Sequence, residues 1–213
     1  MSYKIIVSRF NESIEWLNLE KSNCIIYNKG LPLNISNEII VNNVGRESET
    51  YLRYIIDNYD NLPDVIVFTQ AKISDHYPNK KDDINYLLKL KNEALIKGKS
   101  NPIIIHNVRN MDIPDGSPWH PLWNLIDNIK YYLNDNYKDN NRISFIDWFK
   151  ININTSYPNP IKIYSNAIFS VKKEFILKNT KEYYENLILN VNFHDNPAEG
   201  HFFERSWYYI FKD

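Results

Sequence analysis

Residues 42–70 read NNVGRESETYLRYIIDNYDNLPDVIVFTQ, and this stretch decides the fold. The apolar side chains between residues 47 and 59 recur at the spacing of one helical face, namely Tyr51, Leu52, Ile55, Ile56 and Tyr59. This spacing predicts a helix over residues 47–59. Just before it, Gly45 can take a backbone conformation that is closed to other residues. We therefore expect a tight turn that holds Arg46 at the start of the helix.

A short strand follows this helix. Turn formers fill residues 59–64, and residues 65–68 are all apolar, as expected of a strand that is covered on both faces. The polar residues after the strand include Gln70, Asp75 and His76. Because open α/β sheets bind ligands at the carboxyl ends of their strands, these side chains are candidates for a binding site.

Predicted strands and helices alternate along the first half of the chain. The strands cover residues 3–8, 23–27, 65–68 and 102–105, and the helices cover a short segment after Asn11 and then residues 47–59 and 84–96. This alternation predicts an α/β fold with a mainly parallel sheet and helices on both faces. Further on we expect a helix over residues 121–137, strands over 143–149 and 161–171, a helix over 172–189 and a last helix near Glu199.

Length and composition limit the classes of protein to which the chain can belong. With 213 residues and no repeat or linker, it suits a single domain over residues 1–213. A net charge of -1 gives no reason to expect nucleic acid or an anionic membrane as a partner. Cys24 is the single cysteine and is expected in the core. Without a disulfide, a charged leader or a long apolar run, the sequence predicts a cytoplasmic protein with no membrane span.

Charged and aromatic side chains follow several of the predicted strands. Arg9 follows the first strand, Lys29 the second and His106 the fourth. Trp119 and His120 lie in a stretch with too many helix and strand breakers for regular structure. We expect this stretch to be a functional loop.

Two pairs of an acid and a histidine are candidates for chemistry. Asp75 and His76 are adjacent after the third strand, and His201 and Glu204 are spaced i,i+3, so that they share a face of the last helix. A carboxylate beside an imidazole can act as a base or ligate a metal. The structural alternatives are a solvated loop for the first pair and a capping or salt-bridge cluster for the second.

The chain resembles the domain-of-unknown-function family 3431. The resemblance is carried by NVGRE at 43–47, TYL at 50–52, IIDNYDNLPD at 55–64, FTQ at 68–70, FSV at 169–171 and ERSWYYIF at 204–211. The family is in turn similar to nucleotide-sugar glycosyltransferases of the GT-A type, whose fold is Rossmann-like. This second resemblance implies transfer of a sugar from a nucleotide donor to a saccharide or other hydroxyl acceptor.

The resemblance also implies roles for the candidate residues. The donor pocket would contain the polar residues near the strand ends and the glycine turn: Arg9, Lys29, Arg46, Gln70, His76 and His106. Trp119 and His120 would bind the acceptor. Glu204, with His201 and Asp75 as further catalytic residues, would be the base that deprotonates the attacking hydroxyl.

Metal use stays open at this point. Enzymes of the GT-A type commonly hold the donor diphosphate through a divalent cation on an Asp-x-Asp motif, and this sequence contains no Asp-x-Asp. Either Asp75 and His76 hold Mn²⁺ or Mg²⁺, or arginine and lysine side chains neutralise the phosphates without a metal. Fixed positive charge at the departing diphosphate would lower the barrier in both cases.

Two other functions are compatible with the sequence. The first is a carbohydrate- or nucleotide-binding module without turnover, which the missing Asp-x-Asp motif favours. The second is a metal-dependent hydrolase built on Asp75, His76, His106 and His201, which requires these four residues to converge. The motifs of P-loop proteins, of dinucleotide-binding proteins and of typical α/β-hydrolases are absent.

Overall fold

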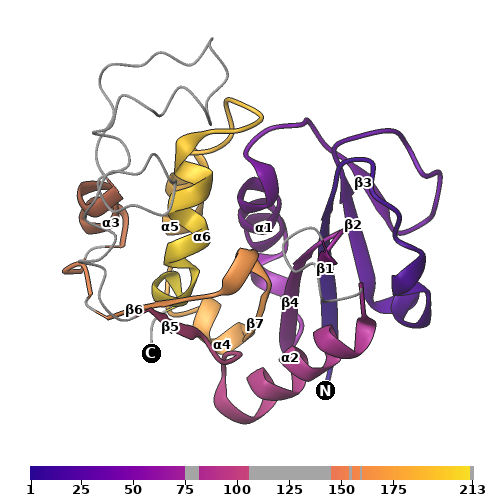
Figure 1. Cartoon of the computed structure of the whole chain (residues 1–213), viewed down its shortest axis with the longest axis horizontal. Coiled ribbons are helices and arrows are strands. Elements are labelled where there is room, and N and C mark those ends of the chain that lie inside the picture. The colour runs from indigo at the N-terminus through magenta and orange to yellow at the C-terminus, as the bar shows by residue number, and fades with distance from the viewer. Residues whose placement is uncertain (75–81, 106–144, 154, 159, 212–213) are drawn as a thin grey trace.

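The computed structural model describes residues 1–74, 82–105, 145–153, 155–158 and 160–211. Its centre is a five-stranded sheet in the order β3-β2-β1-β4-β7 (Figure 1). The strands of this sheet are β1 (Tyr3–Arg9), β2 (Cys24–Asn28), β3 (Glu38–Ile40), β4 (Val65–Gln70) and β7 (Phe169–Lys172). The pairs β1 with β2, β1 with β4 and β2 with β3 are parallel, whereas β7 is antiparallel to β4. The expected mainly parallel sheet is confirmed.

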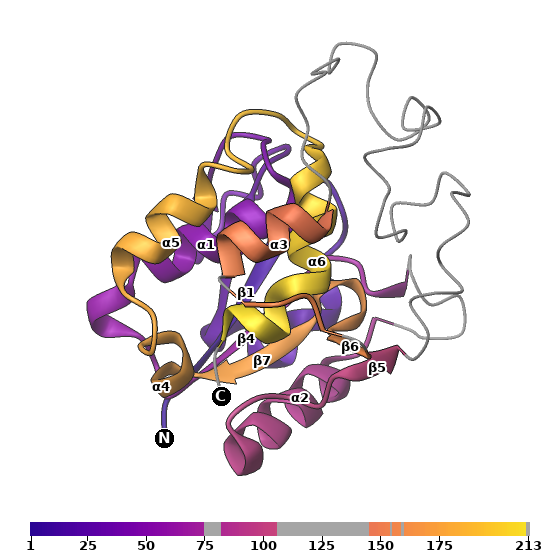
Figure 2. The same ribbon diagram turned by 90° about the vertical axis from the view of Figure 1, so that its left-hand side faces the viewer.

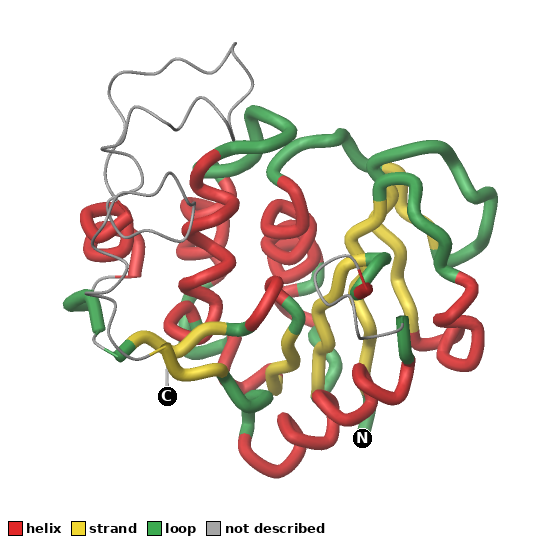
Figure 3. The backbone as a smooth tube through the Cα atoms, viewed as in Figure 1, coloured by secondary structure: helices red, strands yellow, loops and turns green. Residues whose placement is uncertain are grey.

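Helices cover both faces of the sheet (Figures 2 and 3). The helical elements are η1 (Glu15–Asn23), α1 (Arg46–Asp57), η2 (Tyr59–Asn61), α2 (Ile84–Lys97), α3 (Phe145–Ile153), η7 (Ser165–Ala167), α4 (Lys173–Ile176), α5 (Lys181–Ile188) and α6 (Ala198–Ile210). Helix α1 packs against α5 and α6, and α3 packs against α6. In Figure 2 these four helices lie above the sheet and α2 lies below it.

The two helical layers bury opposite faces of the same strands. Ile6 and Ile66 belong to the core under α1, α5 and α6. Ile5, Val7 and Val67 belong to the core under η1 and α2. Since side chains alternate along a strand, a strand that is apolar at every position is buried on both faces. This explains why β1 and β4 lie in the interior of the sheet.

A strand was predicted over residues 143–149, but the described part of this segment, residues 145–149, is helical. Helix α3 begins at Phe145, and its buried side chains Phe145, Trp148 and Phe149 have the i, i+3, i+4 spacing of one helical face. The ring centroids of Trp148 and Phe203 on α6 are 4.9 Å apart. Aromatic and β-branched residues favour a strand locally, but packing on α6 selects the helix, so the strand prediction was wrong.

The predicted strand over residues 161–171 is divided between two sheets. Its first part is β6 (Ile161–Ile163), its last part belongs to β7, and Asn166 and Ala167 between them have φ values of 56° and 54°. Among the described residues, strand β6 pairs only with β5 (Ile103–Ile105), as an antiparallel ribbon outside the main sheet. The strand predicted over residues 102–105 therefore exists, but it is not the fourth parallel strand.

Two further differences concern the boundaries of elements. The helix predicted over residues 172–189 is broken into α4 and α5, because Thr180 accepts a hydrogen bond from the backbone N–H of Tyr183 and begins a new helix. The short edge strand β3 was not predicted. None of the helices in the described residues has the length and apolar character that crossing a lipid bilayer requires.

Candidate functional site

The connections of the sheet change direction between β1 and β4. From β1 the chain passes through η1 to β2, whereas from β3 it returns through α1 on the other face to β4. The carboxyl ends of β1 and β4 are therefore neighbours at a topological switch point, and Ser8 lies opposite Gln70 there. In open α/β sheets such a point is where ligands bind.

A tight turn brings the start of α1 to this edge of the sheet. Gly45 and Arg46 have φ values of 62° and 51°, and the backbone N–H of Gly45 donates to the carbonyl oxygen of His194 at 2.7 Å. A Cβ atom on Gly45 would lie 2.5 Å from both Glu49 Cβ and the carbonyl oxygen of Val191. Only glycine fits here, as the sequence predicted for position 45.

Gly45→Ala is expected to destabilise the protein by about 2 kcal/mol, because alanine is strained at this backbone conformation and would meet a carbonyl oxygen. Gly200→Ala, in the first turn of α6, is the matched control. A Cβ atom there would meet only Arg46 Cδ, at an ordinary 3.6 Å. We expect the control to be neutral or to stabilise by about 0.5 kcal/mol, because alanine favours helix more than glycine does. Urea unfolding measures the stability of both variants. Equal losses of stability for Gly45→Ala and Gly200→Ala would contradict the prediction.

Lys29 stabilises the turn that precedes α1. Its ammonium group donates to the carbonyl oxygens of Val44 and Arg46 and lies 3.1 Å from Glu49 Oε2. Arg53 also pairs with Glu49, at 2.5 Å, so this buried carboxylate has two cationic partners. Two of its donors are thus used in hydrogen bonds, and its charge is paired with the buried carboxylate of Glu49. The structure thus gives Lys29 a role in positioning α1.

Arg9 has a similar structural role in the loop after β2. Its guanidinium donates to the carbonyl oxygens of Phe10, Glu12 and Leu31 and to Asn28 Oδ1, at distances between 2.8 and 3.1 Å. The side chain is buried, with 7% of the residue exposed. Arg9 therefore shapes the carboxyl edge between β1 and β2.

Arg46 reaches from α1 to the first turns of α6. Its Nη1 lies 3.1 Å from Nδ1 and 3.0 Å from Nε2 of His201, and Nδ1 of His201 lies 3.7 Å from Oε2 of Glu204. If the proton of the neutral ring is on Nδ1, it points at Glu204, and the lone pair of Nε2 accepts from Arg46. Three predicted site residues thus form a chain of contacts across two helices, which we call the Arg46 cluster.

Burial and charge set the protonation of the Arg46 cluster. Burial lowers the pKa of His201, so its ring is neutral at pH 7. Burial raises the pKa of Glu204, but the hydrogen bond from His201 and the charges of Arg46 and Arg205 outweigh it and leave this pKa below its usual range. Burial also lowers the pKa of Arg205 to about 9, against the opposing charge of Glu204. At neutral pH the cluster holds an anionic Glu204, a neutral imidazole and the guanidinium ion of Arg46, and the neighbouring Arg205 adds a second guanidinium ion.

The family of the chain is established by a match to a family model. The model described as "Protein of unknown function (DUF3431)" matches residues 5–213. The chain belongs to the DUF3431 family. No curated protein and no solved structure matches it.

The structure also shows two polar residues of this DUF3431 protein that the sequence analysis did not assign to the site. Glu47 is 5% exposed and its Oε2 lies 3.7 Å from Arg46 Nε. The hydroxyl of Tyr51, one helical turn further along α1, is fully buried and has no hydrogen-bond partner among the described residues. The only sequence signal for Glu47 was its position in the first turn of α1, where acidic residues are common for electrostatic reasons alone.

Gln70 is the last residue of β4, and its side-chain amide donates to the carbonyl oxygen of Asn166 at 3.1 Å. Asp75, His76, His106, Trp119 and His120 lie outside the residues that the structure describes, as do the loop and the helix predicted over residues 111–137. Within the described part of the chain, no group of three or more His, Cys, Asp or Glu side chains is arranged to hold a metal ion. Of the predicted site residues, the structure therefore joins Arg46, His201 and Glu204.

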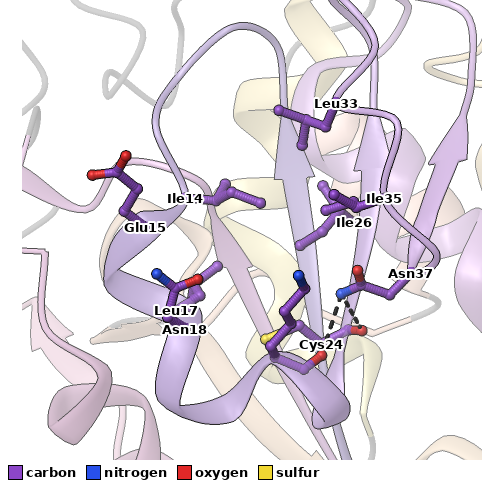
Figure 4. A pocket seen from close by; sticks show the side chains of 10 residues that line it. Ile14, Glu15, Leu17, Asn18, Cys24, Ile26, Leu33, Ile35 and Asn37 are labelled. Atoms are coloured by element: carbon purple, nitrogen blue, oxygen red, sulfur yellow. Dashed lines mark hydrogen bonds between the residues drawn. The ribbon is translucent and has the colours of Figure 1, made fainter.

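A separate apolar pocket lies on the other face of the sheet (Figure 4). It has a volume of about 170 Å³ and lies between η1, β2 and the loop that precedes β3, with Leu17, Ile26 and Ile35 among its lining residues. Cys24 lies at its base, 2% exposed, and burial raises the pKa of its thiol to about 12. The thiol is thus protonated at neutral pH, in agreement with the core position predicted for Cys24.

Proposed function

We propose that the chain is a glycosyltransferase that takes a sugar from a nucleotide-sugar donor and passes it to a hydroxyl acceptor. The observation that carries this proposal is the convergence of Arg46, His201 and Glu204 at the start of α1. A cation and an acid–imidazole dyad thus adjoin each other, as the charge of a diphosphate and the proton of an acceptor require.

Arg46 is the candidate contact for the donor diphosphate. Its side chain is 28% exposed, so it is more accessible than the buried Lys29 or Arg9. A guanidinium binds phosphate oxygens with two parallel hydrogen bonds, and the positive charge stabilises a leaving diphosphate. In this proposal the side chain turns from His201 to the phosphates when the donor binds.

The dyad of His201 and Glu204 is the candidate proton acceptor. Once Arg46 turns away, Nε2 of His201 is able to accept the proton of an attacking hydroxyl, while Glu204 holds the opposite ring nitrogen and stabilises the imidazolium. The alternative base is Glu204 itself. Its pKa is lowered, as is that of His201, and a lower pKa means a weaker proton acceptor.

The strand order supports the same proposal. The parallel order β3-β2-β1-β4, with a switch point between β1 and β4, matches the first four positions of the strand order 3-2-1-4-5-6 of a doubly wound, nucleotide-binding sheet. A GT-A or Rossmann-like assignment for the whole fold is part of the proposal, and fold alone does not fix function.

A divalent cation has two possible places in this scheme. Mn²⁺ or Mg²⁺ would be held by Asp75 and His76, which come after β4 in the chain but lie outside the described residues. Alternatively the donor is bound without a metal, through Arg46. A screen with and without manganese separates the two.

A binding module without turnover is the second candidate. The observation that favours it is the lowered pKa of Glu204, which the interaction with His201 and the charges of Arg46 and Arg205 hold below its usual range against the effect of burial, so that this carboxylate is a poor base. Such a module would bind the nucleotide sugar and release it unchanged. Product analysis after incubation with a bound donor distinguishes this module from an enzyme.

Arg46→Ala is expected to abolish the stabilisation of the protein by nucleotide ligands. In a thermal-shift screen of uridine and guanosine diphosphates and their sugars, a ligand that binds only the native state at 100 times its Kd stabilises by about 2.7 kcal/mol. Arg53→Ala is the matched control, since it removes a positive charge from the same helix but from the pair with Glu49. Nucleotide ligands should still raise the melting temperature of Arg53→Ala. If they also raise that of Arg46→Ala, the result counts against the proposal.

A further inference from the structure

Glu47 is a buried carboxylate, and one of its two oxygens accepts no hydrogen bond from the described residues. Its side chain is 6% exposed, and Oε2 has a single ionic neighbour, Arg46 Nε at 3.7 Å. Oε1 has no hydrogen-bond partner among the residues that the structure describes. An unsatisfied buried acceptor is costly, and in native proteins such a group calls for an explanation.

The Glu47 carboxylate adjoins the Arg46 cluster. Its charge acts on His201 of α6 and on the hydroxyl of Tyr51, which also feels the charge of Glu204. Glu47 and Glu204 thus lie near the same phenol, one from each helix. Whatever Oε1 binds is therefore close to the dyad that we propose for proton transfer.

The charges of the cluster restrict what Oε1 can bind. Glu47 and Glu204 contribute two negative charges, Arg46 and Arg205 contribute two positive charges, and the buried His201 is neutral. A metal ion or an ammonium group would add an uncompensated charge at a buried position, which is costly. A neutral hydrogen-bond donor satisfies Oε1 without this cost, and a hydroxyl group is such a donor.

We propose that Glu47 Oε1 accepts a hydrogen bond from a hydroxyl of the sugar that is transferred. This inference rests on the proposed function, which brings the donor diphosphate to Arg46. The transferred sugar is attached to the diphosphate and, in this proposal, lies beside the dyad of His201 and Glu204, so its hydroxyls are the donors that the ligand brings to Oε1. The ribose of the nucleotide carries the same chemistry on the other side of the diphosphate.

The test compares nucleotide sugars with free nucleoside diphosphates. Calorimetry would measure the Kd of uridine diphosphate glucose, guanosine diphosphate mannose and the two corresponding diphosphates for the unchanged protein and for Glu47→Gln. We expect Glu47→Gln to weaken binding of the sugar-bearing ligand about 10-fold, because a charged acceptor becomes a neutral one. Binding of the free diphosphate should change less than 2-fold. Glu174→Gln, at an exposed acid, is the control and should change neither.

A second measurement avoids any dependence on how Glu47→Gln folds. Donor analogues that each lack one sugar hydroxyl are bound to the unchanged protein, and one of them should lose about 10-fold in affinity, the loss expected for one charge-assisted hydrogen bond. Equal affinities for all analogues would overturn the inference. So would a Glu47→Gln variant that weakens sugar-bearing ligand and free diphosphate equally, since Glu47 would then contact the ribose or act structurally. Both results leave the proposed function intact, whereas binding of no nucleotide at all would overturn both.

Discussion

Glu204→Gln is expected to lower the free energy of unfolding by about 3 kcal/mol, because it leaves buried positive charge without its partner. Glu204 is 5% exposed and lies beside Arg205, which is 4% exposed, and within reach of His201. The amide of glutamine keeps the shape of the side chain but not its charge. Urea unfolding at pH 7 measures the difference.

The same substitution is expected to reduce sugar transfer 100- to 10,000-fold, the range for loss of a group that acts in general-base catalysis. If His201 is the base, glutamine cannot stabilise the imidazolium that forms there, and if Glu204 is itself the base, glutamine cannot accept the proton. Activity is compared at a temperature where the variant is folded, so that stability does not enter the ratio. A destabilised variant with unchanged activity per folded molecule would remove Glu204 from the mechanism.

Glu174→Gln is the control for the effect on stability. Glu174 pairs with Lys172 at 3.7 Å, but its side chain is 63% exposed. Exposed pairs contribute about 0 to 1 kcal/mol, so this variant should unfold almost like the unchanged protein. If Glu204→Gln and Glu174→Gln lower the free energy of unfolding equally, the burial of Glu204 does not explain the loss of stability.

Trp207→Ala is expected to destabilise the protein by about 4 kcal/mol, as is typical of large aromatic side chains removed from a core. Trp207 is fully buried on α6. Its ring centroid lies 5.5 Å from that of Phe169 on β7, 5.7 Å from that of Tyr51 on α1 and 5.9 Å from that of Phe211. It therefore joins α6 to both the sheet and α1.

The effect of Trp207→Ala on binding follows from this position. The contacts of Arg46 with His201 depend on how α1 and α6 pack, so we expect nucleotide binding to weaken together with stability. Phe193→Ala removes an aromatic side chain that is 50% exposed and serves as the control, with a loss below about 1 kcal/mol. Chemical denaturation and the thermal-shift screen check both variants, and a small loss for Trp207→Ala would show that the core repacks around the gap.

Residues 42–70 determined their own structure because every signal in them is local. The glycine turn, the helical period and the apolar run are each read within a few positions, and the structure has Gly45 at positive φ, α1 and β4 in that order. The parallel sheet followed from the alternation of strands and helices. Arg9 and Gln70 were predicted to lie just after their strands. In the structure they are the last residues of β1 and β4.

Other elements depended on tertiary packing. Residues 145–149 suit a strand by composition, but they form a helix whose aromatic rings pack against those of α6. Residues 161–171 suit one strand, but the turn at Asn166 and Ala167 sends the two parts to different partners. Neither outcome can be inferred from short windows of sequence, because the deciding contacts come from segments distant in the chain.

The candidate site shows the same division. His201 and Glu204 are three residues apart, so helical geometry alone predicted that they share a face. Arg46 lies 155 positions from His201, and only the packing of α1 against α6 brings their side chains to 3.0 Å. Glu47 was visible as an acid at a helix start, but its burial and its unused oxygen exist only in the folded chain. Sequence determines which groups a helix face carries, whereas tertiary contacts decide which of these groups are desolvated, and desolvation gives them their chemistry.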